Sequence, residues 1–191
     1  MLKFVFFAVA CVGLAGCLNV NLKSVLPNQT YYSLDNISLT ENDKNTCKNM
    51  DKTYNLNISV LSPYDGKDIL IYDKDSKINV LESFKWIDLP KNMVRNAFIK
   101  IGFKGCLNIE QNMSVAQRAN TIKININDMY VKKDGDYIAY IYLSYEIINY
   151  NMTRIKYDNI ISTYTHANPA NAIQIALTNA LQNVANDLRK Y

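Results

Sequence analysis

Alternating apolar and polar residues predict a β-meander in the second half of the chain. Isoleucines alternate with polar residues across 122–126, and a tight turn at Asp134–Gly135 leads into the run 137–148, which is apolar or aromatic on both faces. A third run, 153–165, follows a turn at Asn149–Asn151. Because a strand that is apolar on both faces belongs inside a covered sheet, we expect 137–148 to be the middle strand of an antiparallel meander.

Shorter runs predict strands in the first half of the chain. Residues 31–34 are β-prone, and apolar side chains alternate across 56–60. The apolar runs 69–72 and 78–81 flank a short charged segment, which is typical of a hairpin. The stretch 35–53 is rich in Asn, Asp and Lys and has no apolar period, so we expect a loop there.

Two segments have the apolar spacing of amphipathic helices. The first runs from Asp88, which is expected as its cap, through Pro90 to Gly102. The second is C-terminal, with Asn168 expected as its cap and Pro169 as its first residue. This order of elements predicts a single α/β (α+β) domain with a mixed or largely antiparallel sheet and packed helices, including the C-terminal amphipathic helix.

The N-terminus has the pattern of a lipoprotein signal peptide. Lys3 precedes an apolar run of about 12 residues, whereas a membrane-spanning helix needs roughly 20. The run ends in Leu14-Ala-Gly-Cys17, a lipobox whose small residues leave room for the peptidase. We therefore expect cleavage after residue 16 and lipid attachment at Cys17. The two or three acyl chains of a mature lipoprotein, such as palmitate, would then hold the protein on a membrane.

This pattern divides the chain into a signal peptide (1–16), a lipidated tether (17–30) and a folded domain (31–191). Leu18 stands where Asp commonly signals retention in the inner membrane. We therefore expect a lipid-anchored outer-membrane protein that faces the periplasm.

Composition fits one domain of modest charge. Cleavage after residue 16 of the 191-residue chain leaves 175 residues, enough for one sizeable core. Loss of Lys3 lowers the formal net charge from +4 to +3, which is too mild a balance to indicate nucleic-acid binding. The mature domain keeps Cys47 and Cys106, and in an oxidising compartment such a pair indicates a disulfide, with two unpaired thiols as the alternative.

Residues that could carry catalysis are scarce. The only histidine, His166, lies between the last strand and the last helix, where a helix-capping role is the simpler interpretation. The chain has no Gly-x-Ser-x-Gly elbow, no phosphate-binding loop and no CxxC pair. We therefore expect no enzymatic activity, no catalytic or metal-binding residues and no cofactor.

Two further features invite a binding or modification role. Five of the 14 tyrosines, at 137, 140, 142, 145 and 150, lie close together in sequence. They either stack on a ligand or bury their rings in the sheet while their hydroxyls reach water. Asn112 begins an Asn-x-Ser sequon with Glu110 two residues before it, which resembles the extended acceptor of bacteria that glycosylate exported proteins, so it is a candidate glycosylation site.

Several short motifs follow one another along the chain. After the lipobox come Tyr31-Tyr-Ser-Leu34, Pro63-Tyr-Asp65, the apolar Ile69-Leu-Ile71 and Phe84-Lys-Trp-Ile-Asp-Leu-Pro90, and the chain ends in an Ala-rich amphipathic helix. On these motifs, over about residues 17–190, the chain resembles the ABC-type transport auxiliary lipoprotein family, which includes the paraquat-inducible lipoprotein. Tyr32, Trp86 and Pro90 are the family markers, and we expect structural roles for them.

The resemblance implies a non-enzymatic subunit of a machine that moves lipids or other apolar molecules across the cell envelope. The partners that it implies are an Mce-type exported protein and an ABC permease and ATPase, while the lipid anchor implies the membrane itself. A homo-oligomer remains open. The alternative is a stand-alone structural or surface-exposed outer-membrane lipoprotein that mediates interactions.

Overall fold

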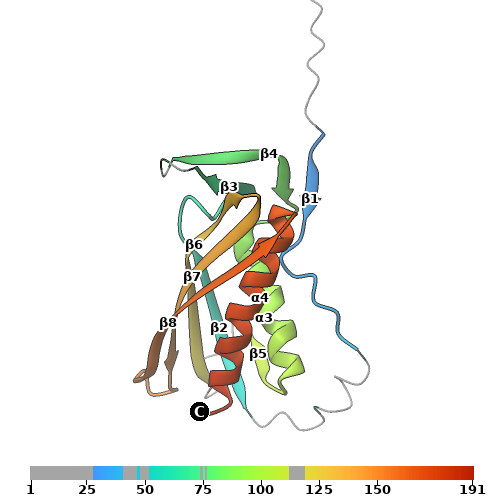
Figure 1. Cartoon of the computed structure of the whole chain (residues 1–191). Helices are drawn as coiled ribbons and strands as arrows, with labels where there is room; N and C mark the ends of the chain where they lie inside the picture. The colour runs from blue at the N-terminus through green and yellow to red at the C-terminus, as the bar shows by residue number, and fades with distance from the viewer. Residues whose placement is uncertain (1–27, 41–46, 48–51, 74, 76, 112–118) are drawn as a thin grey trace, which may run out of the picture.

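Two helices cover one face of a mixed eight-stranded sheet in the computed structural model, which describes residues 28–40, 47, 52–73, 75, 77–111 and 119–191 (Figure 1). The predicted fold, a single α/β domain with a mixed sheet and a C-terminal helix, is confirmed. The strands are β1 (Thr30–Tyr32), β2 (Thr53–Val60), β3 (Asp68–Tyr72), β4 (Ile78–Trp86), β5 (Asn108–Glu110), β6 (Asn120–Asp134), β7 (Asp136–Ile148) and β8 (Arg154–His166), and the helices are α3 (Pro90–Lys104) and α4 (Pro169–Leu188).

Strand β6 is the spine of the sheet because both of its edges are paired. β7 runs antiparallel along one edge for nearly the whole length of β6. β2 and β3 share the other edge: β2 lies parallel to residues 120–126 and β3 lies parallel to residues 131–132. The sheet therefore divides at β6 into a branch that ends in β5 and a branch that continues through β4 to β1.

A bulge in β6 keeps its apolar side chains on the face that the helices cover. The buried isoleucines at 122–126 occupy every second position, but the next buried residues are Met129 and Val131, so the alternation changes phase. The register of β6 against β7 shifts between Ile126 and Asp128, as an extra residue in a bulge requires. The shift returns apolar side chains to the inner face where the second branch begins.

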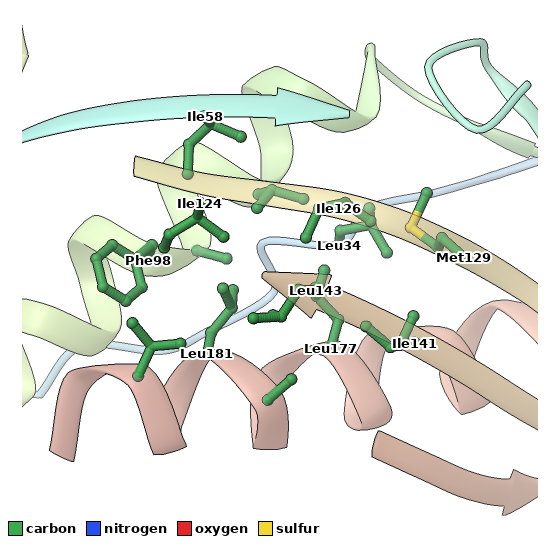
Figure 2. Packing of buried hydrophobic residues seen from close by; sticks show 14 of the residues in the cluster. Leu34, Ile58, Phe98, Ile124, Ile126, Met129, Ile141, Leu143, Leu177 and Leu181 are labelled. Carbon is green, nitrogen blue, oxygen red and sulfur yellow. The ribbon is translucent and has the colours of Figure 1, made fainter. Parts of the chain in front are cut away.

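The core lies between the inner face of the sheet and the two helices (Figure 2). Phe98 of α3 and Leu177 and Leu181 of α4 are fully buried against inner-facing side chains such as Ile124 and Leu143. Burial of one Leu or Phe side chain contributes about 1.5–3 kcal/mol. This apolar layer is therefore the main stabilising feature of the fold.

The two helices begin differently. As predicted, Asn168 caps α4, and its side-chain oxygen accepts a hydrogen bond from the Asn171 backbone N–H at 3.1 Å. The prediction that Asp88 caps α3 is wrong by one residue, because extended Leu89 occupies the cap position without a side-chain bond. Pro90 at the first helical position favours this extended conformation in the residue before it. The Asp88 carboxylate instead accepts a hydrogen bond from the Leu89 N–H at 2.7 Å.

The predicted hairpin of β3 and β4 is confirmed. Strand β5 and the outer face of β7 differ from the sequence predictions. The pattern of residues does not predict β5, because this three-residue strand is defined by its parallel pairing with β2. The expectation of a covered sheet around β7 is correct on the side where α4 packs. It is wrong on the other side, where none of the described helices lies and aromatic side chains cover one another.

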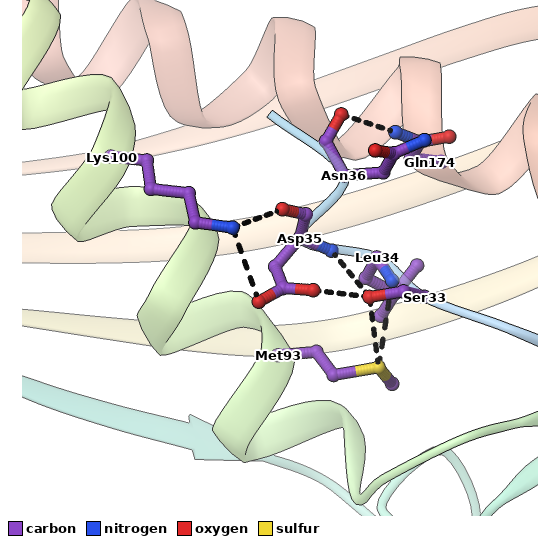
Figure 3. A network of polar contacts seen from close by, with 7 residues as sticks. All are labelled: Ser33, Leu34, Asp35, Asn36, Met93, Lys100 and Gln174. Carbon is purple, nitrogen blue, oxygen red and sulfur yellow. Dashed lines mark hydrogen bonds and ion pairs between the residues drawn. The ribbon is translucent and has the colours of Figure 1, made fainter. Parts of the chain in front are cut away.

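The segment that follows β1 is tied to both helices (Figure 3). Leu34 is fully buried. The Lys100 ammonium of α3 donates to the Asp35 backbone oxygen at 2.6 Å and lies 3.5 Å from its carboxylate, and the Gln174 amide of α4 donates to the Asn36 backbone oxygen at 3.3 Å. These contacts fix the end of the domain from which the chain leads back towards the N-terminus.

A buried polar group joins the end of α4 to the sheet. Asp187 is only 8% exposed, and its carboxylate accepts hydrogen bonds from the Lys190 ammonium at 2.7 Å and from the Tyr145 hydroxyl at 2.5 Å, with Lys156 at 3.6 Å. The bond from Lys190 and then that from Tyr145 hold the pKa of Asp187 below its ordinary value. Burial, followed by the bond to Asp187, raises the pKa of Tyr145.

Candidate functional site

The outer face of the sheet, opposite the helices, carries the most distinctive group of side chains. Successive side chains of a strand point to opposite faces. Tyr145 of β7 points inward, since its hydroxyl reaches Asp187 on α4. Tyr140 and Tyr142 of the same strand therefore point outward. Tyr130 of β6 lies directly across from Tyr140 and shares this outer face.

Four residues, Tyr64, Tyr72, Tyr130 and Tyr140, form what we call the tyrosine cluster. The ring of Tyr130 is its centre, and the distances from its centroid are 4.2 Å to Tyr72, 5.3 Å to Tyr140 and 6.4 Å to Tyr64. Each such ring pair contributes about 0.5–1.5 kcal/mol beyond its buried area. The rings come from β3, β6, β7 and the turn after β2, so the cluster exists only when distant segments have paired on β6.

The hydroxyl groups of the cluster are hydrogen-bonded. The Tyr64 hydroxyl lies 3.0 Å from that of Tyr72 and donates to the Asp128 carboxylate at 3.0 Å. Burial, together with these bonds to Tyr72 and Asp128, raises the pKa of Tyr64 far above its ordinary value. Burial and the charge of Asp128 also raise the pKa of Tyr130. These two phenols therefore stay protonated at neutral pH and serve as hydrogen-bonding and packing groups, not as nucleophiles.

Two clefts flank the cluster, and Tyr140 lines both of them. The larger has a volume of about 510 Å³ and is lined by Tyr72, Lys132 and Ile138 among others. The smaller, of about 260 Å³, reaches across the cluster to Ile161 of β8. The Ile161 side chain is 76% exposed, which is unusual for an isoleucine in a strand. The outer face therefore combines an aromatic centre with an apolar flank.

Charges of both signs surround the larger cleft. Lys132 holds its ammonium group 5.2 Å from the centre of the Tyr140 ring, within the range of a cation–π contact. Lys133, Asp73 and Asp134 also line this cleft. An aromatic centre with a charged and polar rim is the usual composition of a protein interface.

The outer face presents packed rings, bonded hydroxyl groups and exposed charges, which are groups that recognise a ligand or a partner. Within the described ranges, no three His, Cys, Asp or Glu side chains lie close enough to hold a metal ion. The described part of the chain also contains no helix long and apolar enough to cross a membrane. A surface that docks a partner is the use that the geometry supports.

The five tyrosines that the sequence singles out do not form one site. Tyr140 belongs to the cluster and Tyr142 lines the smaller cleft. Tyr145 has a buried ring and a bonded hydroxyl, as the packing interpretation predicts. Tyr137 is partly buried at the edge of the core, and Tyr150 is 56% exposed in the turn between β7 and β8. The strand period separates them because odd and even positions face opposite ways.

The structure joins the two cysteines of the folded domain. Their sulfur atoms lie 2.05 Å apart and their Cα atoms 4.9 Å apart, the geometry of a disulfide between Cys47 and Cys106. The bond links the segment before β2 to the end of α3. Cys17 and Asn112 lie outside the described residues, so lipid attachment and glycosylation remain predictions.

The three marker residues and the histidine have structural positions. Tyr32 lies beside Trp86 where β1 pairs with β4, and its hydroxyl accepts a hydrogen bond from the Asn168 side chain at 3.0 Å. Trp86 is 1% exposed, and Pro90 is the buried first residue of α3. The Asn168 backbone N–H donates to His166 Nδ1 at 2.9 Å, which confirms the capping role of the histidine. These residues hold the strands at this end of the sheet against the helices.

Comparisons with known proteins support the fold. No protein-family model matches the chain, and no curated protein matches its sequence. The crystal structure of an uncharacterized protein matches with a TM-score of 0.62 at 9% identity, over 85% of this chain and 97% of that one. Protein XCC0632 from Xanthomonas campestris, described as DUF330, matches with a TM-score of 0.57 at 12% identity, over 72% of this chain and 80% of that one. At these identities the similarity establishes a shared fold.

Proposed function

We propose that this chain is a non-enzymatic, membrane-anchored auxiliary subunit of an Mce-type ABC transport system that moves lipids or other apolar molecules across the cell envelope. Lipidated Cys17 would hold it on the outer membrane, with the domain facing the periplasm. The lipobox, the order of the sequence motifs and a fold shared with a DUF330 protein support this assignment.

The observation that carries the proposal is the helix-free outer face with its tyrosine cluster. Tyrosine is enriched at binding hot spots because its ring buries a large area while its hydroxyl remains bonded. The cluster is rigid before binding, since its four rings are already packed against one another. A preorganised surface loses little conformational entropy on docking. We assign this face to the contact with the Mce-type protein.

The tether before β1 and the contacts after β1 together determine how the lipid anchor would hold the domain. A tether of about 12 residues reaches roughly 40 Å when extended, which lets the domain stand off the membrane while remaining near it. The bonds from Lys100 to Asp35 and from Gln174 to Asn36 tie the start of the domain to both helices. The tether therefore raises the effective concentration of the docking face near one membrane.

The first test is a crosslinked pull-down of the full-length lipidated chain from native membranes, followed by mass spectrometry. The proposal predicts recovery of an Mce-type exported protein together with an ABC permease or ATPase. Recovery of none of these, while a known envelope complex survives the same procedure, would assign the chain to the stand-alone lipoproteins. Cleavage by protease added to whole cells would point to the same alternative.

Variants on the outer face make the test specific. Tyr140→Ala removes a ring of the cluster, and Lys132→Glu reverses a charge at the rim of the larger cleft without touching the core. Each should reduce partner recovery about tenfold or more, the loss typical of a hot-spot residue. Gln182→Ala, at an exposed position of α4, is the matched control and should leave recovery unchanged.

A further inference from the structure

Strand β8 forms a long free edge of the sheet. It is 13 residues long, and among the described strands it pairs only with β7. The N-terminal strand β1 pairs with β4 in the branch across β6 and does not pair with β8. The backbone N–H and C=O groups on the outer side of β8 are therefore available for another strand.

The second half of β8 lacks the features that protect sheet edges. Natural edges are guarded by charges, proline, bulges or a covering segment. The three charged residues Arg154, Lys156 and Asp158 all lie in the first five positions of β8, whereas Asn159–Thr165 contains no charge, no proline and no glycine. Ile161, in the middle of this stretch, is 76% exposed. The second half of β8 is therefore an edge at which another strand can pair.

We propose that the cover is β8 of a second copy of this chain, paired antiparallel about a two-fold axis at Ile161. Antiparallel pairing of identical strands is self-complementary, because each residue meets its counterpart by symmetry. This register places the most exposed isoleucine of each copy opposite that of the other. The apolar contact then stands at the centre of the outer side of the pairing, where Asn159 and Thr163 flank it.

The register is compatible with the charges of β8. Asn159 meets Thr163, Asp158 meets Tyr164 and Lys156 meets His166, so no carboxylate faces a carboxylate and no lysine faces a lysine. The side chains that face one another across the axis also lie on the same side of the joined sheet, because their positions differ by even numbers. Eleven residues of each strand, 156–166, take part.

Pairing at β8 joins the two sheets and places both tyrosine clusters on one side, with both pairs of helices on the other. The two-fold axis then runs perpendicular to the joined sheet. If both lipid anchors enter one membrane, this axis also stands perpendicular to that membrane, so the two outer faces point the same way. A dimer therefore offers two equivalent docking faces. The dimer proposal does not depend on the transport function proposed above.

Cysteine crosslinking of the full-length chain in native membranes tests the register. Ile161→Cys should form a disulfide-linked dimer on mild oxidation, because the axis brings the two sulfur atoms together. Ile155→Cys is the matched control: residue 155 is also exposed on β8, at 40%, but its opposite position lies beyond the strand. The unsubstituted chain should give no crosslinked dimer, since Cys47 and Cys106 are bonded to each other.

A second variant measures the association itself. Ile161→Lys places two ammonium groups face to face and should weaken dimerisation at least about tenfold in sedimentation of the purified lipidated chain, while Ile155→Lys should not. A dimer trapped at position 161 alone, and lost with Ile161→Lys, supports the proposal. It is overturned by a monomeric chain, by equal crosslinking at 155 and 161, or by crosslinking of position 161 to a different protein.

Discussion

Tyr145→Phe removes one hydroxyl from the buried contact that fastens the end of α4 to the sheet. The lost bond is a hydrogen bond to an ionised carboxylate, a class worth about 1.5–3 kcal/mol. Lys190 at 2.7 Å and Lys156 at 3.6 Å still pair with Asp187, so the charge is not left alone. We therefore expect a loss near the lower end of this range, about 2 kcal/mol, which corresponds to a fall of roughly 4–8 °C in Tm.

The pH dependence of the unfolding free energy shows whether the effect of Tyr145→Phe acts through the ionised Asp187 carboxylate. The folded pKa of Asp187 lies below its ordinary value of 3.8, so the carboxylate stabilises the fold above that pH, and this contribution is lost as pH falls through the folded pKa. Tyr145→Phe moves the folded pKa of Asp187 back towards the ordinary value. The difference in unfolding free energy between the two proteins should be full at neutral pH and should shrink below about pH 4.

Urea denaturation followed by circular dichroism from pH 7 to pH 3 measures this difference. Tyr142→Phe is the control, because its hydroxyl donates only to exposed Asn159 at 3.1 Å. That variant should lose less than about 0.5 kcal/mol at every pH. A Tyr145→Phe effect that equals the control, or that stays constant down to pH 3, would refute the role given to Asp187.

Three further changes test the packing and the crosslink. Replacing both Cys47 and Cys106 by Ser should cost about 4 kcal/mol in urea unfolding, because the bond closes a loop across 59 positions; equal stability would contradict the bond. Gly102→Ala should lower Tm, despite the better helix propensity of alanine, because the new Cβ would lie 2.5 Å from a side-chain carbon of Ile109; a higher Tm would show that Ile109 moves freely. Leu177→Ala should cost about 3–5 kcal/mol in the same urea assay, since the side chain is fully buried, and a loss below 1 kcal/mol would contradict its place in the core.

The sequence predicted the elements that depend on residues close to one another along the chain. The Asn168–Pro169 start of α4 follows from capping chemistry, and the hairpin of β3 and β4 follows from two apolar runs around a short charged turn. The bounds of β3 agree within one residue, but β4 extends from the predicted run 78–81 to Trp86 because its last residues pair with β1. At the start of α3 the sequence prediction is wrong by one residue. Asp88 was expected as the cap, but it precedes the cap residue Leu89 and accepts a hydrogen bond from its N–H.

The sheet arrangement and the tyrosine cluster depend on contacts that the sequence pattern does not encode. β2 and β3 pair with β6 across more than 50 intervening residues, so nothing near Tyr64 or Tyr72 indicates that they meet Tyr130. One signal was available. The tight turn at Gly135, with a φ of 70°, makes the two arms of the hairpin equal and places Tyr130 opposite Tyr140. Counting from that turn would have identified half of the cluster.

The docking role of the outer face is tested most directly by a photoreactive amino acid placed at position 140 of the full-length chain in native membranes. The matched position is 182, on the exposed side of α4. After illumination and mass spectrometry, we expect adducts with an Mce-type exported protein from position 140 and none from position 182. Absence of such adducts at 140, or equal labelling from both positions, would contradict the assignment of the tyrosine cluster as the docking surface.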